Sequence, residues 1–390
     1  MTKTKVATNT TQKSIETIAV HGSKGYDPLT GAISYPIYQS ATFKHEGLHQ
    51  STGYDYARLQ NPTREEVENT VAKLENANFG VAFATGNAAV TAVLSLFKKG
   101  DHLIVSDDLY GGTYRLFEEI YSPYGLEHNF VDTTDIENII DSIKPNTKGI
   151  FIETPSNPMM KVTDLKRVVE IAKDRNITVI VDNTFLTPYF FKPIELGADV
   201  VVHSGTKYLG GHNDTLAGFV VTNSEVTNER IRYYQKSTGA TLAPFDSWLI
   251  LRGIKTLHLR MEYSQKNAIE LAHFLENHPN VTEVYYVGLP THKGHSIIKE
   301  QASGFGAMIS FKVKNLSLVE KVLGSVKVIT FAESLGGVES LITYPHTQTH
   351  SEMPEDFKQK LGLDDHTLRL SVGIEHIDDL LNDLENALGC

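Results

Sequence analysis

Short apolar runs alternate with amphipathic stretches between residues 70 and 245. In the amphipathic stretches the apolar residues recur at helical spacing, so that they share one helix face. Strands that are apolar throughout and alternate with helices are typical of a parallel sheet covered on both faces. The pattern therefore predicts an α/β domain, and its expected strands are the runs HLIVSD, KGIFIET, ITVIVDN, DVVVHS and AGFVVT.

The pattern changes on both sides of this segment. Before it, the chain is rich in Gly, Thr, Ser and Tyr and has few periodic stretches, which predicts an extended arm that packs against something else. After about residue 245 a long helical stretch at 247–278 leads into a smaller unit with the strands GAMISFKV and TLRLSVGI and a closing helix, DDLLNDLENAL. We predict an arm at 1–60, an α/β domain at 61–250 and an α+β domain at 251–390.

The composition argues against several classes of protein. The net charge of −11, without a basic stripe, argues against a nucleic-acid binder. No apolar run approaches the roughly 18 residues of a membrane span, and the polar start lacks the apolar core of a secretory signal. The only cysteine is Cys390, so neither a disulfide nor a thiolate metal cluster is expected. We expect a cytoplasmic metabolic protein.

Two strand ends of the predicted sheet carry side chains of opposite charge, and ligands bind at such ends in open parallel sheets. Asp182 follows ITVIV, where a carboxylate is costly unless it has a cationic partner, although it could be an ordinary turn aspartate. Lys207 follows DVVVHS and is either a surface lysine or a desolvated nucleophile that forms a Schiff base. Ser204 and Thr206 beside it have hydroxyls that suit a phosphate.

Two glycine-containing loops follow other expected strands. Gly86 and Asn87 open a helix after FGVAFA, and the free amides of a helix start bind anions, although many helices begin this way. Tyr110 is followed by two glycines, which would let its ring lie flat on a planar ligand, although alone this segment reads as a turn. A lysine nucleophile, an anion for a pyridine nitrogen, a phosphate cradle and an aromatic lid are together what pyridoxal 5′-phosphate (PLP) requires. The loops therefore predict a PLP enzyme.

The motifs resemble those of the PLP enzymes of cysteine and methionine metabolism. This family includes cystathionine γ-synthase, γ-lyase and β-lyase, methionine γ-lyase and O-acetylhomoserine sulfhydrylase. The resemblance extends from about residue 18 to 388 and rests on YARLQNPT (56–63), DLYGGTYR (108–115), ETPSNP (153–158), VDNTF (181–185), HSGTKYLGGHND (203–214), AESLGGVES (332–340) and LRLSVGIE (368–375). It implies small amino-acid substrates and the type I fold of PLP enzymes, an aspartate aminotransferase-like α/β domain followed by a smaller α+β domain.

The resemblance also implies roles for individual residues. Lys207 would hold PLP and then move protons, Tyr110 would stack on the ring and assist, and Asp182 would pair with the pyridine nitrogen. The phosphate would be held by Gly86, Asn87, Ser204 and Thr206, and by Tyr56 and Arg58 of a neighbouring subunit. The substrate carboxylate would be held by Arg369, Ser334 and Asn157.

The phosphate contacts from the arm imply a homodimer with shared active sites, assembled further into a tetramer. Two segments depart from the family pattern: Thr85-Gly86-Asn87 stands where the family usually has Ser-Gly-Met, and His346 stands where it commonly has Ala. His346 and His350 have the i, i+4 spacing of a metal pair on a helix. Because no third ligand is visible, we expect no metal site.

Glu333 is the residue on which we expect substrate choice to depend. It precedes Ser334, and the resemblance implies Glu here in cystathionine γ-synthases and γ-lyases but apolar or aromatic residues in methionine γ-lyases. An anion at this position can pair with the distal ammonium group of cystathionine. Methionine γ-lyases also have Cys where this chain has Gly112, which counts against that activity.

The leading interpretation is a cystathionine γ-synthase, which acts on O-acylhomoserine and could add an O-acetylhomoserine thiol-lyase activity. The segments FAESLGGVESLITYP and GGHNDTLAG are most similar to γ-synthases, whereas THKGHSIIKEQASGFGAMISF is at least as similar to lyases. Cystathionine γ-lyase is therefore the main alternative, followed by cystathionine β-lyase and methionine γ-lyase. A silent PLP-binding homologue is disfavoured, because every expected catalytic position is filled.

Overall fold

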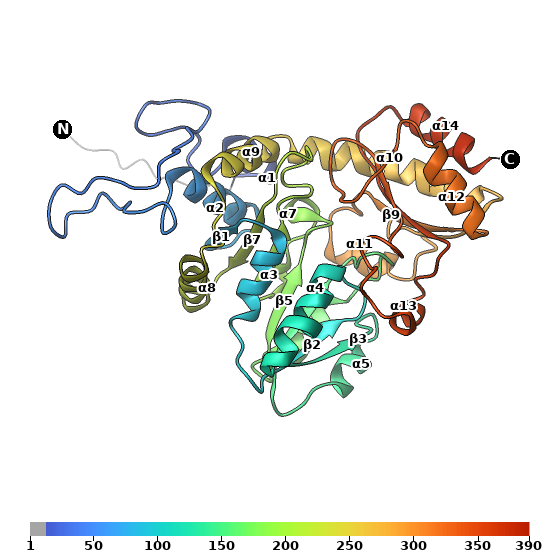
Figure 1. The fold of residues 1–390 in the computed structure, drawn as a ribbon, viewed down its shortest axis with the longest axis horizontal. Helices are drawn as coiled ribbons and strands as arrows, with labels where there is room; N and C mark the ends of the chain where they lie inside the picture. Colours follow the sequence, from blue (N-terminus) through green and yellow to red (C-terminus); the bar gives the residue numbers. More distant parts are fainter. Residues whose placement is uncertain (1–12, 390) are drawn as a thin grey trace, which may run out of the picture.

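The computed structural model describes residues 13–389, so Cys390 and residues 1–12 lie outside the described part. The described chain forms two β-sheets, one of seven strands and one of five, with helices packed against both (Figure 1). The strands of the larger sheet are β1 (Phe79–Phe83), β2 (His102–Ser106), β3 (Glu127–Val131), β4 (Thr147–Glu153), β5 (Thr178–Asp182), β6 (Val200–Ser204) and β7 (Gly218–Thr222). Those of the smaller sheet are β8 (Val281–Tyr285), β9 (Met308–Val313), β10 (Thr330–Phe331), β11 (Leu341–Thr343) and β12 (Thr367–Ser371).

The helices connect these strands and cover the sheets. The first half of the chain contains α1 (Ile15–His21), α2 (Pro62–Leu74), α3 (Gly86–Leu94), α4 (Gly111–Arg115), α5 (Ile136–Asp141), α6 (Leu165–Lys173) and α7 (Thr187–Phe190), with the short segments η1 (Leu116–Tyr121), η2 (Ser122–Tyr124) and η3 (Pro193–Leu196). The second half contains α8 (Glu225–Thr238), α9 (Pro244–Ile254), α10 (Leu257–Asn277), α11 (His295–Gln301), α12 (Leu316–Ser325), α13 (Glu355–Leu361) and α14 (Ile377–Leu388).

The larger sheet has the strand order β1-β7-β6-β5-β4-β2-β3 and confirms the predicted α/β architecture. Each of the five expected apolar runs forms a strand, and β2 to β6 pair in parallel. The expectation of a parallel sheet was wrong for AGFVVT, because β7 is antiparallel to both β6 and β1. Residues 205–217 contain no crossover helix, and a parallel partner for β6 would have needed one.

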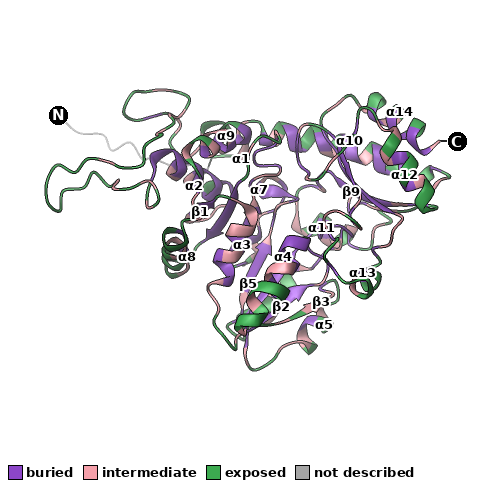
Figure 2. Ribbon diagram, in the orientation of Figure 1, coloured by how far each residue is buried: buried purple, intermediate pink, exposed green. Residues whose placement is uncertain are grey.

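Side chains of the larger sheet alternate between two apolar cores. In β5, Val179 and Val181 lie in the core that includes α2 and α6, whereas Ile180 lies in the core that includes α3 and α4. The central strands are buried on both faces (Figure 2). Polar residues of these strands are therefore concentrated at the strand ends, where loops and solvent can satisfy them.

The smaller sheet has the order β10-β11-β12-β9-β8 and shares a third core with α10, α12 and α14. The single helical stretch expected at 247–278 is two helices, α9 and α10, because the chain leaves helical geometry at Thr256. There the Arg260 side chain donates to Gly253 O (2.8 Å), so a side chain replaces part of the helical hydrogen bonding. The boundaries predicted at residues 60 and 250 stay a prediction.

Residues 22–60, between α1 and α2, extend away from both sheets (Figure 1), whereas α1 packs on α2. This arm is irregular, and several of its apolar side chains are largely exposed, among them Leu29, Ile33 and Leu48. Exposed apolar clusters of this kind commonly mark surfaces that another chain covers. Within residues 13–389, no helix combines the length and the apolar character needed to cross a bilayer.

Candidate active site

Lys207 lies half-buried in the turn after β6, between loops of the larger and the smaller sheet. Its Nζ donates to Ser334 Oγ at 2.6 Å. Its pKa is lowered to about 8, mainly by burial and also by nearby Arg369, while Glu333 opposes the shift. A lysine whose ammonium form is destabilised in this way is a better base and nucleophile near neutral pH.

Asp182 ends β5, the strand next to the one that carries Lys207. Its Oδ1 accepts hydrogen bonds from the Thr184 amide (3.0 Å) and hydroxyl (2.6 Å), and no residue in 13–389 donates to the other oxygen. Burial raises the pKa of Asp182, against the bonds from Thr184 and the nearby His203. The free carboxylate oxygen is therefore suited to a cationic partner from a bound molecule.

Glu153 is a second carboxyl group at this edge, and our sequence reasoning missed it. It ends β4 in register with Asp182, and its Oε2 accepts from the Tyr110 amide at 3.1 Å. Burial first, and then the neighbouring charge of Asp182, raise the pKa of Glu153 well above its usual value. Two buried carboxyls this close hold one negative charge more easily than two, which is why the pKa of Glu153 is raised. A glutamate at the end of the apolar run KGIFIE was the available signal.

The residues expected to hold phosphate gather where α3 begins. Gly86 and Asn87 are the first two helical residues, so their amides precede the first intrahelical hydrogen bond. A Cβ at Gly86 would lie only 3.0 Å from Ser204 Oγ, which places the end of β6 against this helix start. The Thr206 hydroxyl, in contrast, donates to Ala217 O (3.2 Å) and accepts from Ala217 N (3.0 Å).

Tyr110 lies directly before α4, and Gly112 makes room for its ring. A Cβ at Gly112 would collide with the Tyr110 ring and would lie 2.8 Å from Asn87 Nδ2. The Tyr110 ring therefore lies close to the start of α3. Tyr110 remains 41% exposed, which leaves space for a planar group.

Arg369, on β12, contacts the two other residues expected to bind the substrate carboxylate. Its Nη1 donates to Asn157 Oδ1 (2.8 Å) and its Nη2 donates to Ser334 O (2.9 Å). Burial lowers the pKa of Arg369 to about 10, which leaves it a cation at neutral pH. Ser334 has a φ of +85°, a strained conformation for a residue with a side chain, and such strain is concentrated at functional sites.

A pocket of about 460 Å³ opens beside this cluster. Glu333 lies exposed at its rim, next in the chain to Ser334. The pocket is lined by Thr206, Asn213, Asp214, Thr215, Leu216, Ala332, Glu333, Ser334 and Leu341. A molecule that binds at Lys207 would therefore extend toward an acidic rim.

Tyr56 and Arg58 contact each other and α8 instead of this cluster. Arg58 Nη1 donates to Lys236 O at 2.6 Å, and its guanidinium lies 5.6 Å from the centroid of the Tyr56 ring. Tyr56 is 45% exposed. Within the described chain neither residue bonds to the cluster around Lys207, so a contribution to phosphate binding would have to reach another copy.

A buried polar network lies behind Asp182 and Ser204, and sequence reasoning missed it too. His203 Nε2 lies 2.7 Å from Glu75 Oε1, and Asn183 Nδ2 donates to the same oxygen at 2.9 Å. All three side chains are fully buried. The signal was present in the motifs VDN and HSG, where a buried polar residue adjoins each site residue.

The two histidines with metal-like spacing face different partners. His346 Nε2 lies 3.3 Å from Glu355 at the surface, whereas His350 Nε2 is directed toward backbone carbonyls in the interior. Among residues 13–389 there is no cluster of three or more His, Cys, Asp or Glu arranged to hold a metal ion.

The model of the Cys/Met metabolism PLP-dependent enzymes matches residues 16–389. The chain belongs to this family. The predicted cofactor, pyridoxal 5′-phosphate, and the predicted class of PLP-dependent C–S bond-forming or -cleaving enzyme are thereby confirmed. The individual roles of the site residues stay predictions.

Relatives of this PLP-dependent enzyme have different activities. The chain is 50% identical over 373 residues to the cystathionine gamma-lyase of Bacillus subtilis, covering 96% of this chain and 98% of the relative. It is 48% identical over 375 residues to the cystathionine beta-lyase of Lactococcus lactis subsp. cremoris, covering 96% and 99%. A crystal structure of the cystathionine gamma synthase of Xanthomonas oryzae pv. oryzae has a TM-score of 0.95 at 40% identity, covering 97% and 98%. The likeness confirms the type I fold, and the three activities leave the reaction open.

The residues at the site fit PLP. Asp182 has a free carboxylate oxygen for a protonated pyridine nitrogen, and the starting amides of α3 with Ser204 suit a phosphate. Nη1 of Arg369 donates only to Asn157 among residues 13–389, so its second N–H remains for a substrate carboxylate.

Proposed function

We propose that this enzyme acts at the γ-carbon of homoserine-derived amino acids, as a cystathionine γ-synthase that joins O-acylhomoserine to cysteine. The observation that carries the proposal is Glu333, an exposed carboxylate at the rim of the pocket beside Ser334. Cystathionine has a second ammonium group far from its reacting carbon atoms, and a carboxylate at the rim can pair with it.

Lys207 is the proposed base. Bound PLP serves as an electron sink, which acidifies the hydrogens on the substrate α- and β-carbons. With its lowered pKa of about 8, Nζ of Lys207 can take and return protons near neutral pH. Ser334 Oγ, 2.6 Å away, holds Nζ on the side where the substrate binds. Departure of the γ-substituent needs two deprotonations, and one mobile lysine can perform both.

The other residues bind and orient. Arg369 would hold the substrate carboxylate, with Asn157 and Ser334 fixing the plane of its guanidinium. Asp182 would stabilise the charge on the pyridine nitrogen, and Tyr110 would stack on the ring and assist proton transfer. The proposed phosphate ligands are Gly86, Asn87, Ser204, Thr206 and, from a second copy, Tyr56 and Arg58.

The direction of the reaction is proposed from the pocket lining. The segments 210–218 and 331–345, which are most similar to γ-synthases, contribute eight of the nine lining residues, whereas 291–311, which is at least as similar to lyases, contributes none. The second candidate is cystathionine γ-lyase, which is supported by the Bacillus subtilis relative. A methionine γ-lyase is disfavoured, because this chain has Gly112 where methionine γ-lyases have cysteine.

Substitution of Glu333 by valine tests the role of the rim carboxylate. We expect Glu333→Val to lower the ratio of the kcat/KM for cystathionine to that for methionine by roughly tenfold to hundredfold, the size of one lost charge-assisted contact. Steady-state kinetics with both substrates measures this ratio. Glu270→Val, an exposed change on α10, is the matched control and should leave the ratio unaltered. An unchanged ratio in Glu333→Val would remove Glu333 as the selector.

We also propose a homodimer with shared active sites, assembled further as a tetramer. Two observations support it. The arm exposes apolar side chains, and Arg58 bonds to Lys236 of α8 instead of to the cluster around Lys207. Mixing Arg58→Ala subunits with Lys207→Ala subunits should restore activity, because one hybrid site then has both intact residues. Mixing Arg58→Ala with the double variant Arg58→Ala/Lys207→Ala is the control and should stay inactive. Absence of rescue after proven subunit exchange would contradict the shared site.

A further inference from the structure

Three chain segments that are far apart in the sequence meet behind the proposed catalytic residues. They comprise residues 108–111, 156–159 and 346–350. His350 lies where they meet and is 1% exposed. No step of the proposed mechanism uses this buried titratable side chain.

His350 links the other two segments through one ring nitrogen. Its Nε2 lies 3.2 Å from Leu109 O and 3.1 Å from Asn157 O. Carbonyl oxygens only accept, so Nε2 carries the hydrogen and donates to both. Burial lowers the pKa of His350 to about 4, so the ring is neutral and Nδ1 accepts from the Thr349 hydroxyl at 2.7 Å.

Each carbonyl that His350 binds belongs to a part of the proposed site. Leu109 directly precedes Tyr110, the proposed stacking residue. Asn157 binds Arg369 through its side-chain oxygen while its backbone oxygen accepts from His350. The shared hydrogen bond therefore connects Tyr110, the proposed stacking residue, with Asn157 and Arg369, the pair proposed to hold the substrate carboxylate (the Asn157–Arg369 clamp).

The backbone next to His350 packs directly against the start of α4, so a shift of the 346–350 segment would also shift α4. A Cβ at Gly111 would collide with Thr349 O, so the start of α4 touches the 346–350 segment directly. Protein interiors packed this tightly move in units instead of bending locally.

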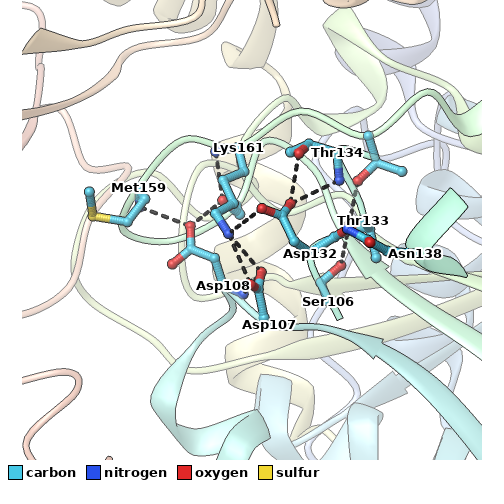
Figure 3. Close-up of polar contacts among 11 residues, drawn as sticks. Ser106, Asp107, Asp108, Asp132, Thr133, Thr134, Asn138, Met159 and Lys161 are labelled. Atoms are coloured by element: carbon cyan, nitrogen blue, oxygen red, sulfur yellow. Dashed lines mark hydrogen bonds and ion pairs between the residues drawn. The ribbon is translucent and has the colours of Figure 1, made fainter. Parts of the chain in front are cut away.

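The same two loops are joined at a second point (Figure 3). The buried Asp108 carboxylate accepts from the Ser156 hydroxyl and from the Met159 amide, the latter at 2.9 Å. Lys161 lies between Asp107 (2.9 Å) and Asp132 (3.1 Å), which anchors the far end of the second loop. The loops before Tyr110 and around Asn157 are thus held on two sides.

We propose that His350 is a positioning residue that fixes the Tyr110 ring and the Asn157–Arg369 clamp relative to each other. The proposal rests on the roles given above to Tyr110 and Arg369. Its consequence is that cofactor stacking and substrate carboxylate binding are coupled through one donated hydrogen. Loss of that hydrogen would leave two buried carbonyls without their partner and would loosen both loops at this end, although the Asp108 contacts would still join them.

Two substitutions that differ by one methylene group test the role of the donor. His350→Gln places an amide N–H near the position of Nε2, whereas the amide of His350→Asn ends near the position of Nδ1 and cannot reach both carbonyls. We expect His350→Gln to stay near wild type and His350→Asn to raise KM roughly tenfold, as for one lost buried hydrogen bond, with a much smaller change in kcat. His346→Ala, on the same segment but paired with Glu355 instead of the two loops, should change neither constant.

Hydrogen exchange of the holoenzymes supplies a readout that needs no turnover. In His350→Asn the peptides that cover 108–116 and 154–163 should both exchange faster, whereas in His346→Ala neither should. Equal KM values for the Gln and Asn variants, or faster exchange in only one peptide, would overturn the proposal. In wild-type holoenzyme the two peptides should open at the same denaturant concentration, and separate openings would overturn the coupling without any variant.

The two proposals can fail separately. An enzyme that turns over neither cystathionine nor O-acylhomoserine would refute the proposed function, while the exchange measurements would still decide whether His350 couples the loops. An active enzyme in which the Gln and Asn variants behave alike would refute only the coupling.

Discussion

Replacing Lys207 with alanine is expected to lower kcat by roughly 10³-fold or more, toward the upper range for loss of a general acid–base group. Nζ of Lys207 lies in a desolvated position with a pKa lowered to about 8, and no other lysine nitrogen among residues 13–389 is bonded to Ser334. Steady-state assays of the purified variant measure the loss. A variant within tenfold of wild type would contradict the assignment of the base.

The same lysine should hold the cofactor, and borohydride reduction tests this independently of activity. Reduction fixes an imine as a stable amine, so peptide mass spectrometry locates the attachment. We expect the reduced cofactor on the peptide that contains Lys207. Lys161 is the informative comparison, because both carboxylates around it keep its pKa raised and its amine protonated. Cofactor on any lysine other than Lys207 would overturn the assignment.

Substitution of Asp182 by asparagine is expected to lower kcat by roughly 10²-fold, as for loss of a strong charge-assisted hydrogen bond. An asparagine keeps the size of the side chain and can still accept from Thr184, but its amide cannot compensate a positive charge on the ring nitrogen. The measurement is kcat, together with the absorption spectrum of the bound cofactor, which depends on protonation of the ring.

Glu153→Gln is the matched control for this prediction. Glu153 lies beside Asp182 in register on the neighbouring strand, and burial together with the charge of Asp182 raises its pKa, which favours the neutral form. Gln can still accept from the Tyr110 amide, so we expect a change in kcat of no more than a few-fold. Equal losses in both variants would show that the site needs two polar carboxyl groups instead of one charge.

Local sequence signals predicted most of the larger sheet but not its strand directions. Apolar runs such as ITVIV have few conformations that bury them on both faces, so their strands could be located from the sequence. The direction of β7 depends on the path of residues 205–217, which connect it to β6. The local sequence of a loop of that length does not specify whether the next strand runs parallel or antiparallel. The helix break at Thr256 depends on Arg260, whose side-chain bond to Gly253 exists only once the helices are packed.

Some residues of the candidate site could likewise be predicted from the sequence, and others could not. Lys207 and Asp182 could be proposed from the sequence, because a charged side chain at the end of a buried apolar strand is energetically costly unless it has a partner. Glu153 gave the same signal and was passed over. His350 could not be placed, since its contacts come from segments about 190 and 240 residues away in the sequence. A spacing that suggested a metal pair corresponds in the structure to one partly exposed histidine paired with Glu355 and one buried donor.

Product analysis tests the central claim, reaction at the γ-carbon in the direction of synthesis, most directly. One incubation contains O-acetylhomoserine with cysteine, and the other contains cystathionine alone. We expect cystathionine as the main product of the first and slower release of cysteine and 2-oxobutanoate in the second. Homocysteine and pyruvate as the main products from cystathionine, with no cystathionine formed in the first incubation, would contradict it.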